Sequence, residues 1–213
     1  MQKYAVLTCD VVNSRNIAPK GILLDTLKKI LIETGDIFLG DYELYRGDSF
    51  QVLMPTADHA INAAIAIRAG LIAQSPSKRE KWDARVAIGI GEVNYEGQSV
   101  AESDGEAFIL SGLGLNELYE TKARLIIKTP YPAITTKVAL VTKFADSIIS
   151  NWTARSGEIA YMSLLQPQSQ HQMAQRLDKA QSTIARRLAT AKFDLIQEYI
   201  GYVNRTVRED FLQ

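Results

Sequence analysis

The sequence predicts an α+β domain followed by an all-α region. Strand-like and helix-like segments alternate up to about residue 130, a tight Gly-Asp reversal joins two of the strand-like segments, and no convincing strand pattern follows residue 138. The order β-α-β-β-α-β-α-β, with a hairpin in the middle, is that of split βαβ, ferredoxin-like or palm-type sandwiches. A doubly wound sheet is the less favoured alternative, because it needs a crossover where the hairpin lies.

The first strand, helix and hairpin follow from local patterns. "YAVLTCDVV" (4–12) is rich in β-branched and other apolar residues, which predicts a mostly buried strand. From Pro19 to about Leu39, leucines recur at helical spacing, and Pro19 suits the first turn of a helix. "YELYRGDSFQVLMP" (42–55) is strand-like on both sides of its Gly-Asp pair, which predicts a hairpin.

The remaining elements are expected in the order helix, strand, helix, strand, helix. Residues 56–74 are alanine-rich with apolar residues on one face, and "DARVAIGIGEV" (83–93) is a strand whose glycines suggest close approach of another backbone. A helix around 105–120 and a short strand at 123–128 come next. The two prolines of "TPYPAITTK" (129–137) predict a break, and 138–152 a connecting helix.

Length and composition limit the possible functions. The 213 residues can bury a sizeable core, in one large or two modest domains. Lysine plus arginine and aspartate plus glutamate each number 24, so whole-chain charge favours neither nucleic acid nor membrane as a partner. Cys9 is the only cysteine, which excludes an intrachain disulfide and a multi-cysteine zinc site. Without a signal-peptide pattern or a membrane-spanning apolar run, a cytoplasmic protein is expected.

Two aspartates are the candidate metal ligands. Asp10 ends the first strand and Asp48 lies in the hairpin, and in the split βαβ order these strands are neighbours. Taken singly, Asp48 is typical of a turn and Asp10 of a cap. Together they suit a hard cation such as Mg²⁺, which can bridge to phosphate oxygens. The polar turn after Asp10 could offer backbone N–H groups and Arg15 to a phosphate.

Four stretches resemble a known family in their order along the chain. "CDVVNSR", "RGDSFQVLM", "VAIGIGEV" and "SDGEAF" resemble the SatD family of bacterial proteins, over residues 4 to about 115. That family is itself similar to class III nucleotidyl cyclases and other palm domains. The resemblance implies a palm-type sheet with Asp10 and Asp48 where cyclases place two metal-binding aspartates. It also implies a nucleotide ligand, for which the candidate residues are Asn13, Ser14, Arg15, Arg46 and Gly47.

The sequence departs from the cyclase pattern where catalysis would need it. Cyclases carry an asparagine and an arginine, four residues apart, after the fourth strand; the best alignment places Ile109 and Leu113 there. Leu113 cannot supply the positive charge that phosphoryl transfer needs. "YELYR" also lacks a clear counterpart of the base-selecting lysine. Nucleotide binding is therefore favoured over catalysis, and no catalytic residue is assigned.

The C-terminal segment "SQHQMAQRLDKAQSTIARRLATAKF" (169–193) predicts a helix-turn-helix. Apolar residues fit the inner faces of two helices across a short turn. "AQSTIARRL" resembles the recognition helix of many bacterial regulators, although Asp178 replaces the usual turn glycine and Lys179 the next apolar residue. The alternative is a basic, solvated helix in a plain bundle. The DNA-binding candidates are Lys179, Gln181, Ser182, Arg186 and Arg187.

The sequence thus predicts a cyclase-like α+β domain over 1–130, a connector helix over 131–152 and a helix-turn-helix domain over 153–213. The leading hypothesis is a homodimeric, DNA-binding transcriptional regulator that senses a nucleotide with Mg²⁺. A metal-dependent nucleotidyl cyclase or transferase is the rival. A domain that has lost its ligand and serves only in assembly is the third possibility.

Overall fold

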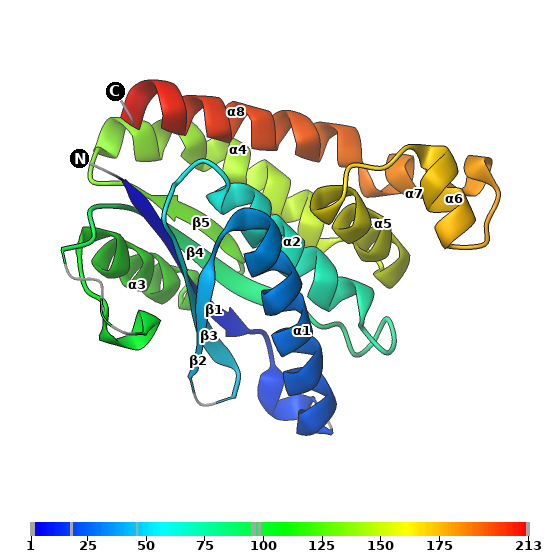
Figure 1. Ribbon diagram of the computed structural model, residues 1–213, viewed down its shortest axis with the longest axis horizontal. Helices are drawn as coiled ribbons and strands as arrows, with labels where there is room; N and C mark the ends of the chain where they lie inside the picture. The colour runs from blue at the N-terminus through cyan, green and yellow to red at the C-terminus, as the bar shows by residue number, and fades with distance from the viewer. Residues whose placement is uncertain (1–2, 18, 46, 95–96, 98, 212–213) are drawn as a thin grey trace.

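The computed structural model describes residues 3–17, 19–45, 47–94, 97 and 99–211, and its centre is a five-stranded mixed sheet (Figure 1). The strand order is β2-β3-β1-β4-β5. Strand β1 pairs antiparallel with both β3 and β4, and β5 runs parallel to β4. The α+β prediction is therefore confirmed. The strands are β1 Tyr4–Val11, β2 Asp41–Tyr45, β3 Ser49–Met54, β4 Ala84–Gly91 and β5 Leu125–Lys128.

Helices cover the two faces of the sheet unequally. On one face, α1 (Lys20–Phe38) and α2 (Ala60–Ala73) pack over the alternate apolar residues of β1, β3 and β4. On the other face, α3 (Glu106–Tyr119) packs on β4 and β1. This packing depends on Gly89, where an added Cβ would lie 2.2 Å from the carbonyl oxygen of Ala107.

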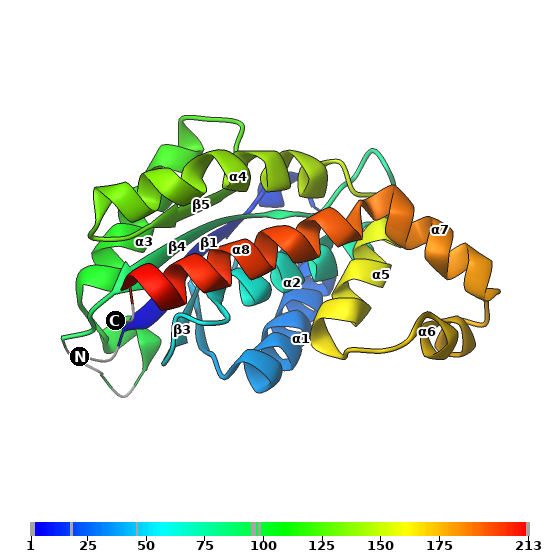
Figure 2. The ribbon, with the colours of Figure 1, turned by 90° about the horizontal axis from the view of Figure 1, so that it is seen from above.

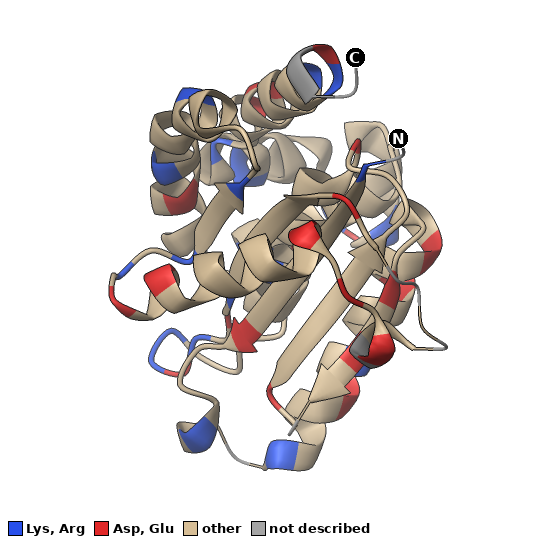
Figure 3. Ribbon diagram, turned by 90° about the vertical axis from the view of Figure 1, so that its left-hand side faces the viewer, with Lys and Arg blue, Asp and Glu red and all other residues tan. Residues whose placement is uncertain are grey.

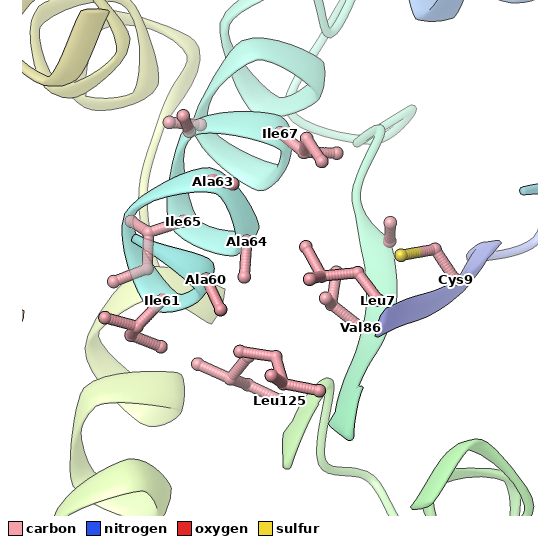
Figure 4. Packing of buried hydrophobic residues seen from close by; sticks show 14 of the residues in the cluster. Leu7, Cys9, Ala60, Ile61, Ala63, Ala64, Ile65, Ile67, Val86 and Leu125 are labelled. Carbon is pink, nitrogen blue, oxygen red and sulfur yellow. The ribbon is translucent and has the colours of Figure 1, made fainter. Parts of the chain in front are cut away.

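Helix α2 is buried on every side, because helices from the C-terminal part cover the side that faces away from the sheet. Its isoleucines and alanines are almost fully buried, and Figure 4 shows Ala60 and Ala64 directed towards Leu7 and Val86 of the sheet, with Ile61 and Ile65 directed away. The helices that cover this side of α2 are α4 (Pro132–Ser150), α5 (Ala154–Leu165) and α8 (Phe193–Phe211). Figure 2 shows α8 lying along α2, with α4 beside it.

Two shorter helices lie at one end of the long axis of the molecule (Figure 1). They are α6 (Gln170–Arg176) and α7 (Gln181–Ala191). Together with α5 they enclose a small apolar cluster of their own. The residues in it are Ile159, Met162, Met173, Ala174, Leu177, Ile184 and Leu188.

The division of the chain into three segments stays a prediction. The main apolar cluster contains residues of β1, α2, α4, α5 and α8 alike. Helix α4 starts at Pro132, inside the stretch where a break was predicted. Proline is well tolerated in the first turn of a helix, so Pro132 can begin the helix and does not interrupt it. Among the described residues, no helix combines the length and the apolar character needed to cross a membrane.

A buried ion-pair network joins α2, the start of β4 and α4. Arg68 is fully buried; its Nε donates to Asp83 Oδ1 (2.9 Å) and its Nη1 to Asp146 Oδ1 (2.7 Å). Arg124 also donates to Asp83 through Nη1 (2.6 Å). Burial opposes the charge of Arg68, but the two carboxylates outweigh it and raise its pKa. Burial likewise opposes the charge of Asp83, and the two guanidinium groups lower its pKa.

Candidate functional site

Strand pairing brings the two predicted metal ligands to the same edge of the sheet. Asp10, near the end of β1, lies opposite Ser49 of β3 and Arg85 of β4. Asp48 directly precedes β3, and its carbonyl oxygen accepts a hydrogen bond from the Val11 N–H (3.0 Å). The aspartates come together because β1 is the neighbour of the hairpin strand β3.

Hydroxyl and guanidinium groups surround the two carboxylates. The Ser14 hydroxyl donates to Asp48 Oδ2 (2.5 Å), and the Ser49 hydroxyl donates to Asp10 Oδ1 (3.3 Å). Arg85 Nη1 lies 3.5 Å from Asp10 Oδ2, and its guanidinium lies over the ring of Tyr119 at 5.2 Å from the centroid. Among the described residues, Arg85 is therefore the cation that contacts this pair of acids through Asp10.

The electrostatics of the site favour an added positive charge. Burial raises the pKa of Asp10, and the neighbouring charge of Asp48 raises it further. The hydrogen bond from Ser49, the charge of Arg85 and a hydrogen bond from Tyr119 offset part of this. Burial and the charge of Asp10 also raise the pKa of Tyr119. Arg85 thus compensates the negative charge only in part.

The donor atoms present fit a divalent cation that keeps much of its water. Among the described residues no group of three or more histidine, cysteine, aspartate or glutamate side chains could hold a metal, so Asp10 and Asp48 would be the only acidic ligands. Mg²⁺ is commonly held by one or two carboxylates together with water and phosphate oxygens. Each ionised carboxylate oxygen can accept more than one hydrogen bond, so the contacts from Ser14 and Ser49 leave room for a cation.

Of the predicted nucleotide-binding residues, Ser14 and Gly47 lie beside Asp48, Asn13 and Arg15 flank Ser14 in the chain, and Arg46 is outside the described residues. Asn13 has a left-handed backbone (φ 54°) and leads into the short 3₁₀ helix η1, Ser14–Asn16. Gly47 also has positive φ (82°), and Arg15 is exposed. A cavity of about 220 Å³ beside Asp48 is lined by Ser14, Lys20, Gly21, Leu23, Leu24, Gly47 and Asp48.

Sequence reasoning missed three side chains near the site. Arg85 contacts both Asp10 and the ring of Tyr119, and Lys20 lines the small cavity. For Arg85 a signal existed, because an arginine inside an apolar strand needs a partner, and the strand order makes β4 a neighbour of β1. Nothing in the sequence indicated that the last turn of α3 ends beside Asp10.

The predicted DNA-binding residues differ in their surroundings. Lys179, Gln181, Ser182 and Arg186 are exposed at the turn and on the outer side of α7. Arg187 is only 16% exposed, and its Nη1 donates to Glu158 of α5 (2.7 Å). The turn between α6 and α7 spans residues 177–180, and Asp178 has a left-handed backbone (φ 50°), which a glycine would adopt without strain.

Comparison with solved structures finds similarity to cyclase domains over part of the chain. A bacterial light-regulated adenylyl cyclase is 14% identical, with 59% of this chain and 75% of the other covered and a TM-score of 0.47. The active GGEEF domain of a diguanylate cyclase from Vibrio cholerae is 11% identical, with 61% and 84% covered and a TM-score of 0.43. A guanylyl cyclase domain of the RhoGC fusion protein from the aquatic fungus Blastocladiella emersonii is 18% identical, with 54% and 74% covered and a TM-score of 0.41.

No protein-family profile and no curated protein matches the sequence. The resemblance to the SatD family therefore stays a prediction. At identities of 11–18% and TM-scores below 0.5, the structural similarity implies no activity for this chain.

Proposed function

We propose that the chain is a DNA-binding regulator that responds to a phosphate-bearing ligand, a nucleotide with Mg²⁺ at Asp10 and Asp48. The observation that carries the proposal is the arrangement of α5, α6 and α7. Three helices enclose one small apolar cluster, and a four-residue turn with a left-handed Asp178 joins the last two. This arrangement supports a helix-turn-helix, with α7 as the recognition helix.

The surface of α7 supports contact with DNA. Gln181 and Ser182 stand in its first turn, where base edges are usually read, and Arg186 follows one turn later; all three are exposed. Lys179 in the turn is placed for a phosphate contact. Arg187 belongs to the internal ion pair with Glu158 and is not part of the proposed contact surface.

A physical connection between the two sites supports a ligand response. The first turn of α1 lines the cavity beside Asp48. Later in the same helix, Glu33 accepts a hydrogen bond from the Tyr161 hydroxyl of α5 (2.8 Å). Because α5 is also part of the α5–α7 cluster, a ligand that shifts α1 acts on the helix that supports α7.

DNA binding is tested by fluorescence polarisation on labelled duplex from upstream of the chain's own coding region, with a random duplex as competitor. We expect Mg²⁺ with ATP or GTP to change the affinity. Arg186→Ala should weaken binding by about 1–3 kcal/mol, whereas Arg79→Ala, on an exposed loop, should not. Equal binding of both duplexes under every ligand condition would contradict the proposal.

Ligand binding is tested separately by thermal unfolding with MgCl₂, alone and with nucleotide. A ligand bound only by the folded chain adds about 2.7 kcal/mol at one hundred times its Kd, so the midpoint should rise. Asp48→Asn should abolish the rise, and Asp194→Asn, an exposed position on α8, should retain it. Light scattering on the same samples measures whether the chain is the expected homodimer.

A metal-dependent nucleotidyl cyclase or transferase is the second candidate, favoured by the carboxylate pair alone. Ile109 and Leu113 are 61% and 58% exposed on α3 and offer no positive charge to a phosphoryl group. The test is chromatography of ATP and GTP after incubation with Mg²⁺ or Mn²⁺. Product formation that Asp48→Asn abolishes would establish the enzyme; unchanged nucleotide with both metals would exclude it for these substrates.

A further inference from the structure

A groove of about 1020 Å³ runs beside β2, which lies at one edge of the sheet. The C-terminal half of α1 forms one flank, and residues 99–103, which include the short 3₁₀ helix η2 (Val100–Glu102), form part of the other. The groove shares no lining residue with the site at Asp10 and Asp48. It lies at the start of β2, whereas Asp48 lies at the far end of the β2–β3 hairpin.

The backbone of β2 is available to another strand. Its residues pair with β3 on one side, and within the described chain no backbone hydrogen bond joins Asp41–Tyr45 to a segment on the other side. An edge strand of this kind presents a row of N–H and C=O groups outward. An extended peptide can satisfy these groups by adding itself to the sheet.

The two flanks of the groove differ in chemistry. Tyr42 and Leu44 point to the α1 side and pack on the main apolar cluster. On that side the groove is lined by Leu31, Ile32 and the 71% exposed Leu39. Asp41 and Glu43 point to the opposite side, where Ser99 and Ser103 line the groove.

The charge of the groove has one sign. Asp36 of α1 adds a third acid, and no lysine or arginine is among the described residues that line the groove. Figure 3 shows acidic segments following one another along the side of the molecule on which α1 and β2 lie. A partner with the opposite charge is therefore favoured.

We propose that β2 binds an extended segment of a partner protein in which apolar residues alternate with lysine or arginine. Side chains of an added strand point alternately to the two flanks. Apolar residues then contact Ile32 and Leu39, which are 49% and 71% exposed, and basic residues pair with Asp41 and Glu43. A second copy of β2 does not fit, because Asp41 and Glu43 would face like charges on the added strand.

The probe is a fluorescein-labelled peptide of about seven residues, the length of an ordinary strand, that alternates valine with lysine. Fluorescence anisotropy should show saturable binding to the full chain. The same peptide with glutamate for lysine should not bind. A version methylated on the backbone nitrogens that would pair with β2 should bind at least about tenfold more weakly, because it cannot donate those hydrogen bonds.

Charge reversal tests the side-chain part of the proposal. Asp41→Lys with Glu43→Lys should weaken binding of the lysine peptide at least about tenfold. Asp194→Lys with Glu198→Lys makes the same change of net charge on exposed positions of α8 and should leave binding unchanged. Any of three results would overturn the proposal: the lysine peptide does not bind, its methylated version binds equally well, or both double variants weaken its binding equally. A dimer of the unliganded chain that the peptide dissociates would do the same, since a second copy would then occupy β2.

Discussion

At the scale of single residues, Asp10 is held where its charge is disfavoured. It is 16% exposed, and the carboxylate of Asp48 lies close enough to raise its pKa. Asp10 lies in β1 and is paired with β3 and β4, so its backbone position is fixed by the sheet and not by a loop. A carboxylate kept ionised at such a place lowers stability unless a cation compensates it.

Asp10→Asn should therefore stabilise the unliganded chain at neutral pH. An acid whose pKa is raised on folding stabilises the folded state fully at a pH below its ordinary pKa of 3.8. This contribution is lost as the pH rises through the pKa that the acid has in the folded state. The melting midpoint of the variant should exceed that of the natural chain at pH 7, and the two should converge below pH 3.8. Thermal unfolding across this range, in the presence of a chelator, measures the difference; a lower midpoint for Asp10→Asn at pH 7 would contradict it.

At the scale of elements, the contact between α3 and β4 depends on small residues. An added Cβ at Gly89 would lie 2.2 Å from the Ala107 oxygen and 2.5 Å from the Ser111 nitrogen, both backbone atoms. Gly89→Ala should lower the free energy of unfolding by about 1–3 kcal/mol through overpacking. Gly112→Ala, on α3 and facing open space, should raise it by about 0.5–1 kcal/mol. Urea denaturation of the two variants and the natural chain measures both changes in the free energy of unfolding.

The ion-pair network predicts a larger effect at Arg68. Arg68→Met leaves Asp146 buried without its ion-pair partner Arg68, while Asp83 keeps its ion pair with Arg124. Removing one partner of a buried pair costs about 3–5 kcal/mol, a large part of the stability of an ordinary domain. Arg79→Met, at an exposed loop position, is the matched control and should change the urea midpoint little.

The network was not predicted from the sequence, whereas the position of the first strand beside the hairpin was. A hairpin between two helix-like segments limits the possible sheets to a few, and in the split βαβ order the strand of Asp10 lies beside the hairpin. Arg68, in contrast, pairs with residues 15 and 78 positions away. A single arginine in an otherwise apolar helix indicates a buried partner. Which carboxylates would serve depends on how α4 packs, and local pattern does not give that.

At the scale of the whole molecule, the C-terminal helices complete the core around α2. Helices α4, α5 and α8 contribute to the same apolar cluster as the sheet. The full chain should therefore unfold in one transition, with far-UV circular dichroism and tryptophan fluorescence giving the same urea midpoint. A chain ending at residue 130 should expose the outer side of α2 and aggregate or bind a hydrophobic dye. Two resolved transitions in the full chain, or a stable monomeric 1–130 fragment, would instead show that the first 130 residues fold alone.

The all-round burial of α2 also has a consequence for synthesis. Residues 60–73 leave the ribosome well before α8, which begins at Phe193, has been made. At about 5–20 residues per second, the interval lasts from several seconds to nearly half a minute. Until then α4 and α5 can cover only part of the outer side of α2, and exposed apolar surface of this kind is what chaperones bind. The growing chain is thus expected to depend on a chaperone until its last helix is available.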